Sequence, residues 1–225
     1  MVSFVRGLTY PLRGLSFALR HRALLRFFPG PILLGLALVV GEILALRFAI
    51  HRFLAQSSGW VIALAWLGGL LGAVLVFLAL QGVLAAPFCD ALSARVEALS
   101  GAAPPSAGLS GTALSIGHAA LRALAYLGLL VILFLVGLFV PGMWLASLLV
   151  SSLYAALDYL DYPTTRRRWS FAQKLDLVGR HKGAAIGFGL AASVLTAVPL
   201  LGLAVAPMAA VGGTLLFLDL QAPKR

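Results

Sequence analysis

The stretch PILLGLALVVGEILALRFAI, residues 31–50, decides the fold class of this 225-residue chain, and only Glu42 and Arg47 in it are charged. A hydrocarbon core of about 30 Å needs about 20 helical residues, so this run is long enough to cross a bilayer. The whole chain is 61% hydrophobic and 11% charged, with a mean hydropathy of +1.02. Soluble chains carry about 25% charged residues. The sequence therefore predicts an all-α integral membrane protein, with residues 1–225 forming a single membrane domain.

Further apolar segments follow at 59–86, 112–140, 142–157, 183–199 and 200–219. The first two are long enough to cross, and the last three are short or borderline. Pro141 with Gly142, and Pro199, separate neighbouring segments without any charged residue. An uncharged turn can stay in the membrane if protein covers its backbone groups. We therefore expect two long transmembrane helices within 31–86 and two helical hairpins, 112–160 and 183–219, that are only partly inserted.

The lysines and arginines between the apolar segments predict the orientation of the chain. If the N-terminus is cytoplasmic, the basic interfacial segment 1–30, the loop with Arg95, the basic loop 161–182 and the C-terminal tail all lie inside. Only Arg52 then faces outside. Because an excess of Lys and Arg marks cytoplasmic loops, both termini are predicted to be cytoplasmic.

Two segments outside the apolar runs are amphipathic. In FCDALSARVEALS, residues 88–100, apolar side chains share one helical face, and Asp90, Ser93, Glu97 and Ser100 share the other. This pattern predicts an interfacial helix, which with a Pro-, Ser- and Gly-containing loop makes up 87–111. Residues 170–182, SFAQKLDLVGRHK, form a second such piece, in which Asp176 and Arg180 are spaced for an i,i+4 ion pair.

Composition and motifs exclude several other classes of function. The net charge of +10 would favour nucleic acid in a soluble chain, but basic residues beside apolar spans favour anionic lipids as partners instead. Cys89 is the only cysteine, so the sequence predicts neither an intrachain disulfide nor a cysteine-rich metal site. The four histidines are scattered, and neither a catalytic nor a phosphate-binding motif occurs. We therefore expect no enzyme activity, metal or cofactor.

Three stretches carry a resemblance that spans nearly the whole chain: PFCDALSARVEALSG (87–101), DYPTTRRRWSF (161–171) and RHKGAAIGFGLAASVLTAVPLLGLAVAPMAAVGGTLLF (180–217). They resemble the CysZ-type sulfate permease family, which includes the etoposide-induced membrane proteins. The resemblance implies uptake of sulfate or a related oxyanion across the inner (plasma) membrane by a multi-pass homo-oligomer. It also implies two long transmembrane helices and partly inserted hairpins.

The family's sulfate-binding signature, Gly-Leu-Arg-Arg, corresponds here to Ala23, Leu24, Leu25 and Arg26. The second arginine is kept, while the glycine and the first arginine are absent. Arg22 lies one helical turn before Arg26 and can supply a second charge on the same face. In one interpretation, these arginines bind an oxyanion beside the free N–H groups near the start of the helix after Gly30. In the other, they contact lipid phosphates while neighbouring phenylalanines anchor the interface.

Ionisable residues inside the apolar spans suggest either a substrate path or a structural ion pair, because a charge at mid-membrane costs several kcal/mol unless it is paired or hydrated. Glu42 lies about 17 Å and Arg122 about 15 Å from the cytoplasmic ends of their predicted helices, so the two depths match. His118 shares a face with Arg122, and it could instead lie at the interface.

Two other patterns predict structural roles. Asp161 and Arg166 are expected to hold the basic loop in shape, which the family resemblance at both positions supports. Gly68 with Gly72, and Gly183 with Gly187, have the spacing of close helix contacts. Two hypotheses for the function remain: an anion permease, or a membrane scaffold that keeps the family fold without transport.

Overall fold

The computed structural model describes residues 3–102, 124, 128–129, 131–133, 135–137, 140, 142–196 and 201–222, and within these ranges the chain forms helices and no strands. The ordered elements are α1 (Phe4–Arg20), α2 (Arg22–Leu25), α3 (Pro29–Leu54), α4 (Gly59–Leu99), α6 (Met143–Arg166), α7 (Phe171–Arg180), α8 (Lys182–Thr196) and α9 (Leu201–Gln221). The predicted all-α class is confirmed. His118, Arg122 and the turn at Pro199 lie outside the described residues.

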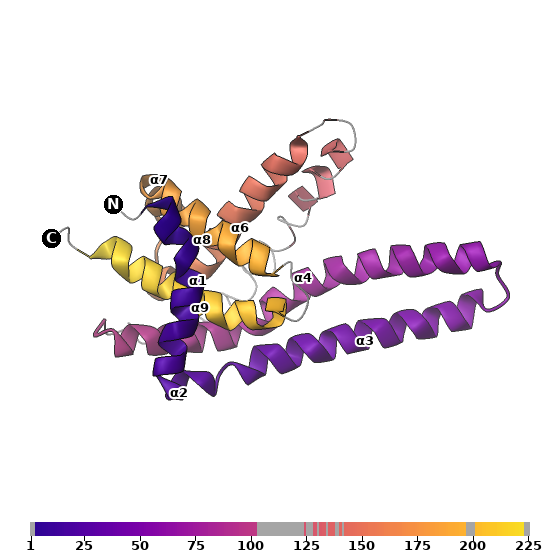
Figure 1. Cartoon of the computed structure of the whole chain (residues 1–225), viewed down its shortest axis with the longest axis horizontal. Coiled ribbons are helices and arrows are strands. Elements are labelled where there is room, and N and C mark those ends of the chain that lie inside the picture. Colours follow the sequence, from indigo (N-terminus) through magenta and orange to yellow (C-terminus); the bar gives the residue numbers. More distant parts are fainter. Residues whose placement is uncertain are drawn as a thin grey trace.

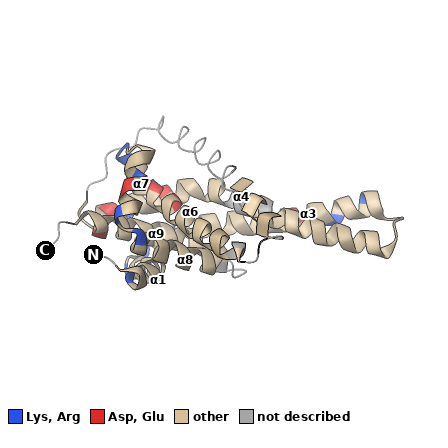
Figure 2. Ribbon diagram, turned by 90° about the horizontal axis from the view of Figure 1, so that it is seen from above, with Lys and Arg blue, Asp and Glu red and all other residues tan. Residues whose placement is uncertain are grey.

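A long hairpin made by α3 and the first part of α4 projects from a body made by the other helices and the last part of α4 (Figure 1). The stretch Arg22–Leu54 is long and apolar enough to cross a membrane, and little of its most apolar part is buried in the isolated chain. Large apolar side chains cover this surface, including Phe48 (70% exposed) and Trp60 (84%). Figure 2 shows that charged residues gather in the body and are few along the hairpin. Because water would disfavour such a surface, the hairpin is the part of the chain suited to lipid.

Helix α4 runs without a break from Gly59 to Leu99, and Pro87 lies inside it. The helix predicted at 88–100 is present, but it continues the apolar helix instead of beginning separately. Proline removes one backbone hydrogen bond but does not end this helix. The polar face of the segment is also covered by protein, since Ser93 and Glu97 are fully buried. This burial places polar side chains of α4 inside the body.

The body has one main apolar core, to which α1, α4, α6, α8 and α9 contribute, including Tyr10, Leu92, Phe188 and Phe217. Helix α9 is long and apolar enough to cross a membrane, but most of it is buried in this core. Sequence analysis placed α8 and α9 in the second hairpin, and both are helical over the described residues. Helix α9 therefore packs mainly against protein rather than facing outward as α3 does.

Glycines allow the body helices to pack at short range. A Cβ added to Gly187 would lie 2.2 Å from the carbonyl oxygen of Phe4, and one added to Gly189 would lie 1.7 Å from that of Ser152. No side chain fits at these contacts. In contrast, a Cβ on Gly68 or Gly72 would meet nothing within 4 Å. The expectation of close packing is thus met at Gly187 but not at Gly68 and Gly72, which face outward from the hairpin.

The amphipathic helix predicted at 170–182 is present as α7 (Phe171–Arg180), whereas the first residues of the predicted basic loop 161–182 belong to the end of α6. Helix α6 continues to Arg166, and α7 begins after Ser170. Ser170 and Gln173 form a capping box, in which each side chain bonds the backbone N–H of the other, satisfying donors at the start of α7. The predicted i,i+4 pair is confirmed, with Arg180 Nη2 lying 2.8 Å from Asp176 Oδ2. The connection therefore has a defined conformation.

Candidate functional site

Arg22 and Arg26 lie at the base of the hairpin, immediately before α3. Arg22 begins the short helix α2, and Arg26 is its C-terminal cap in helical conformation. Leu24, between them, is fully buried in the core, whereas both arginines are exposed. Because each arginine is two positions from Leu24, its side chain points roughly 200° away around the helix. Burial of Leu24 therefore directs both guanidinium groups outward, and Leu25 lies half-buried beside them.

Neither guanidinium forms an ion pair or a hydrogen bond with a residue of the described ranges. A third cation lies close by, because the guanidinium carbon of Arg95 on α4 is 5.7 Å from the centroid of the Phe27 ring. Sequence reasoning did not connect Arg95 with Arg26, since the two are far apart along the chain. Positive charge from two segments therefore gathers at the start of α3, where the helix dipole also favours an anion.

The backbone at the start of α3 provides fewer donors than we expected. The helix begins at Pro29, and Pro31 follows two residues later, so two of its first three residues have no N–H. The N–H of Phe28 donates to Leu25, and that of Ile32 donates to Phe28. Only Gly30 retains a free donor in this turn, which corrects the expectation of several exposed N–H groups. An anion here would depend mainly on guanidinium groups.

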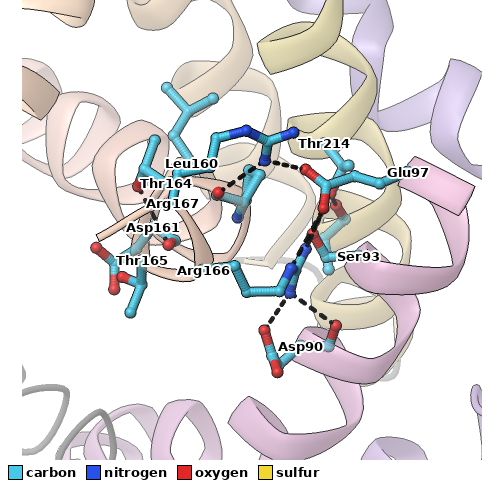
Figure 3. Close-up of polar contacts among 12 residues, drawn as sticks. Asp90, Ser93, Glu97, Leu160, Asp161, Thr164, Thr165, Arg166, Arg167 and Thr214 are labelled. Atoms are coloured by element: carbon cyan, nitrogen blue, oxygen red, sulfur yellow. Dashed lines mark hydrogen bonds and ion pairs between the residues drawn. The ribbon is translucent and has the colours of Figure 1, made fainter. Parts of the chain in front are cut away.

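A second group of charges is buried where α4, α6 and α9 meet (Figure 3). Arg166, at the end of α6, has only 4% of its side chain exposed and pairs with Asp90 and Glu97 of α4. Its Nη2 donates to Ser93 Oγ at 2.6 Å, and its Nε donates to Glu97 Oε2 at 3.3 Å. Thr214 of α9 donates to Ser93 at 2.7 Å. The Arg166 guanidinium therefore joins α6 to α4, and Ser93 joins α4 to α9.

Arg167 completes this cluster from the next position. It pairs with the second carboxylate oxygen of Glu97, donates to the carbonyl oxygen of Pro163 at 3.0 Å, and lies 4.8 Å from the centroid of the Phe217 ring. Two arginines thus face two carboxylates; the donors of Arg166 are occupied, whereas Arg167 donates through Nη1. Partial burial raises the pKa of the Asp90 carboxyl, and the guanidinium of Arg166 opposes this shift. We call Asp90, Ser93, Glu97, Arg166, Arg167 and Thr214 the ionic clasp.

The ionic clasp includes residues for which the sequence predicted other surroundings. Arg166 was expected to hold a loop, but it lies in the last turn of α6 and binds α4. Asp161 pairs with Lys174 of α7, whose ammonium also donates to Thr165 at 3.0 Å. The spacing of Asp90, Ser93 and Glu97 on one helical face was visible in the sequence, but their partners lie about 70 residues away in α6.

Two further predicted residues have different outcomes. Glu42 lies within α3, and its Oε1 is buried without a hydrogen-bond partner among the described residues. Arg122 and His118 lie outside the described ranges, so the predicted pairing of Glu42 with Arg122 stays a prediction. Cys89 is fully buried, and burial raises the pKa of its thiol to about 12. The thiol is therefore unreactive in the folded chain.

The fold and the site define an all-helical membrane protein in which cations gather at the base of an apolar hairpin. The sequence matches the model of the family described as EI24, sulfate transporter CysZ/etoposide-induced protein 2.4, over residues 10–207. Because this match covers most of the chain, the protein belongs to that family.

Curated relatives agree with this membership. The chain is 30% identical over 214 residues to the sulfate transporter CysZ of Pectobacterium atrosepticum, covering 86% of this chain and 78% of the relative. It is also 30% identical over 173 residues to the sulfate transporter CysZ of Salmonella typhimurium, covering 71% and 68% respectively. The resemblance inferred from the sequence is therefore confirmed.

Proposed function

We propose that the chain is a sulfate permease of the inner (plasma) membrane, active as a homo-oligomer with both termini in the cytoplasm. The curated relatives are named sulfate transporters, and the stretch Arg22–Leu54, which contains α3, is long and apolar enough to cross a membrane. Arg22 and Arg26 bind the anion at the cytoplasmic end of α3. A scaffold without transport is the alternative function, and the relatives' names do not favour it.

One observation supports this binding site above all: Arg22 and Arg26 are exposed and unpaired among the described residues, beside the end of a membrane-spanning helix. Arg166, in contrast, is held by two carboxylates. A sulfate ion could reach Arg166 only by breaking buried ion pairs, which costs several kcal/mol. Arg95 adds a third guanidinium group near Phe27. It brings positive charge close to Leu25, the position at which the family's first signature arginine is absent. These three arginines are the best-placed groups for a divalent oxyanion.

The test is sulfate binding to the purified full chain. Hydrogen bonds to charged groups contribute about 1.5–3 kcal/mol, so Arg26→Ala should weaken sulfate binding by roughly ten- to a hundredfold. Arg26→Lys should recover only part, because lysine keeps the charge but lacks the planar fork of the guanidinium. Leu25→Arg should tighten binding by restoring the first arginine of the family's signature.

Arg6→Ala serves as the control, because Arg6 is an exposed arginine at the far end of α1. Its removal should leave sulfate affinity unchanged. If Arg26→Ala and Arg6→Ala had equal effects, the site would not be at Arg26. Titration with selenate and chloride tests selectivity, and a chain that binds none of the three anions would support the scaffold alternative.

We also propose that Glu42 pairs with Arg122, with His118 close to the same path. The unpartnered Oε1 of Glu42 supports this pairing, since a buried carboxylate needs a cation or a hydrogen-bond donor. Glu42→Gln and Arg122→Gln should each lower the melting temperature of the purified chain, and the double variant should lose less than the sum. Strictly additive losses would contradict direct contact.

A further inference from the structure

A seven-residue repeat begins with α1: FVRGLTY (4–10), PLRGLSF (11–17) and ALRHRAL (18–24), of which the third copy leaves the helix after Arg20. In each copy an apolar residue precedes an arginine, which gives the pairs Val5–Arg6, Leu12–Arg13 and Leu19–Arg20. Seven residues make nearly two helical turns, so equivalent positions return to almost the same face. The repeat therefore builds two parallel stripes, one apolar and one basic, about 100° apart around the helix.

The opposite face of α1 is fixed to the body by its glycines. A Cβ on Gly7 would lie 2.3 Å from the carbonyl oxygen of Ala184, and one on Gly14 would lie 2.4 Å from that of Met208. Helix α1 therefore packs closely on α8 and α9, and it cannot rotate to bury its other faces. Its outward orientation follows from this packing.

Both stripes face away from the protein. Val5, Leu12 and Leu19 are 68%, 57% and 58% exposed. The three arginines beside them are also exposed, and none pairs with a carboxylate of the described residues. The guanidinium carbon of Arg13 lies 5.2 Å from the centroid of the Tyr10 ring. Successive arginines are spaced by about 10.5 Å along the axis.

The direction of α1 matches a position on the membrane surface. Figure 1 shows α1 running crosswise to the α3–α4 hairpin. If the hairpin crosses the bilayer along its length, as the apolar length of α3 supports, a helix crosswise to it at its base lies along the surface. There an apolar stripe can enter the acyl region while an adjacent basic stripe stays at headgroup level.

We propose that the outward face of α1 is a docking surface for anionic phospholipids, with Arg6, Arg13 and Arg20 binding headgroup phosphates and Val5, Leu12 and Leu19 inserted among the acyl chains. Charge complementarity supports this occupant, because the stripe carries three unpaired cations and no acid. The surface is separate from Arg22 and Arg26, so it does not depend on sulfate transport.

The first test measures binding of short-chain phosphatidylglycerol and phosphatidylcholine to the detergent-purified full chain. A basic residue at an anionic surface contributes about fivefold to the binding constant, so Arg6→Gln, Arg13→Gln and Arg20→Gln together should weaken phosphatidylglycerol binding by roughly a hundredfold. The charge-matched control combines Arg168→Gln, Arg180→Gln and Lys182→Gln, and it should retain most of the affinity. Equal losses in the two triple variants, or no preference for phosphatidylglycerol in the parent chain, would overturn the proposal.

Two further arms identify the source of the phosphate. Glycerol phosphate, the headgroup chemistry without acyl chains, should bind far more weakly than the lipid, and equal binding would indicate a free-anion site instead. Sulfate affinity should be unchanged in the α1 triple variant, which keeps this test distinct from that of Arg26. If the triple variant lost sulfate and lipid binding together, α1 would not be a separate lipid surface.

The second test locates the helix in a membrane. A bimane label on Leu12→Cys should be quenched more strongly by brominated acyl chains than a label on Arg13→Cys, because only position 12 lies on the apolar stripe. Buried Cys89 does not compete for the label. Equal quenching at the two positions would contradict an interfacial α1.

Discussion

Glu97→Gln tests whether the ionic clasp holds the body together. Glu97 is fully buried and accepts from both Arg166 and Arg167, so the amide variant leaves two guanidinium groups with less negative charge. Removing one partner of a buried pair costs about 3–5 kcal/mol. For a chain of this size 1 kcal/mol corresponds to about 2–4 °C, so the melting temperature should fall by roughly 6–20 °C. Thermal unfolding of the purified protein in detergent measures this directly.

The control is Asp176→Asn, which breaks the pair with Arg180. Both side chains of this pair are exposed, Asp176 to 57% and Arg180 to 73%. Exposed pairs contribute about 0–1 kcal/mol, so this variant should unfold within a few degrees of the parent. Arg166→Gln combined with Glu97→Gln should cost less than the sum of the single changes. Equal shifts for Glu97→Gln and Asp176→Asn, or strict additivity in the cycle, would refute a stabilising role for the clasp.

Two other contacts can be tested in the same unfolding assay. Tyr10→Phe removes the 2.5 Å hydrogen bond to Asp219. The free energy of unfolding should fall by about 1.5–3 kcal/mol because the acceptor is a carboxylate. An unchanged melting temperature would mean that this bond contributes nothing to stability. Gly189→Ala should prevent α8 from packing on α6, because the new methyl group would overlap the Ser152 carbonyl. Its control is Gly179→Ala, where the methyl group enters open space and the change should be neutral or stabilising by about 0.4–1 kcal/mol. The opposite order of stability would contradict the close approach of these helices.

The sequence predicted those parts of the fold that depend on local pattern. The apolar run at 31–50 predicted α3, and the spacing of Asp176 and Arg180 predicted their ion pair. Hydrophobic length and i,i+4 spacing are local properties, so no knowledge of neighbouring helices was needed.

The errors and omissions concern contacts between distant segments. The change from apolar to amphipathic pattern suggested a boundary near residue 87, but α4 is continuous there and packs against α3, α6 and α9. The partners of Glu97 lie in α6, and no pattern in 88–100 could name them. The prolines at 29 and 31, in contrast, were visible in the sequence and already implied few backbone donors at the start of α3.

The continuity of α4 has a mechanical consequence. Its 41 residues extend about 60 Å, roughly twice the thickness of a hydrocarbon core. One continuous helix therefore joins the apolar hairpin to the residues that bind Arg166 and Arg167. If α4 rotates as one unit about its contact with α6, a small rotation there gives a much larger sideways displacement at the turn after Leu54. The tilt of the hairpin therefore depends on how α4 packs in the body, several helical turns away from the tip of the hairpin.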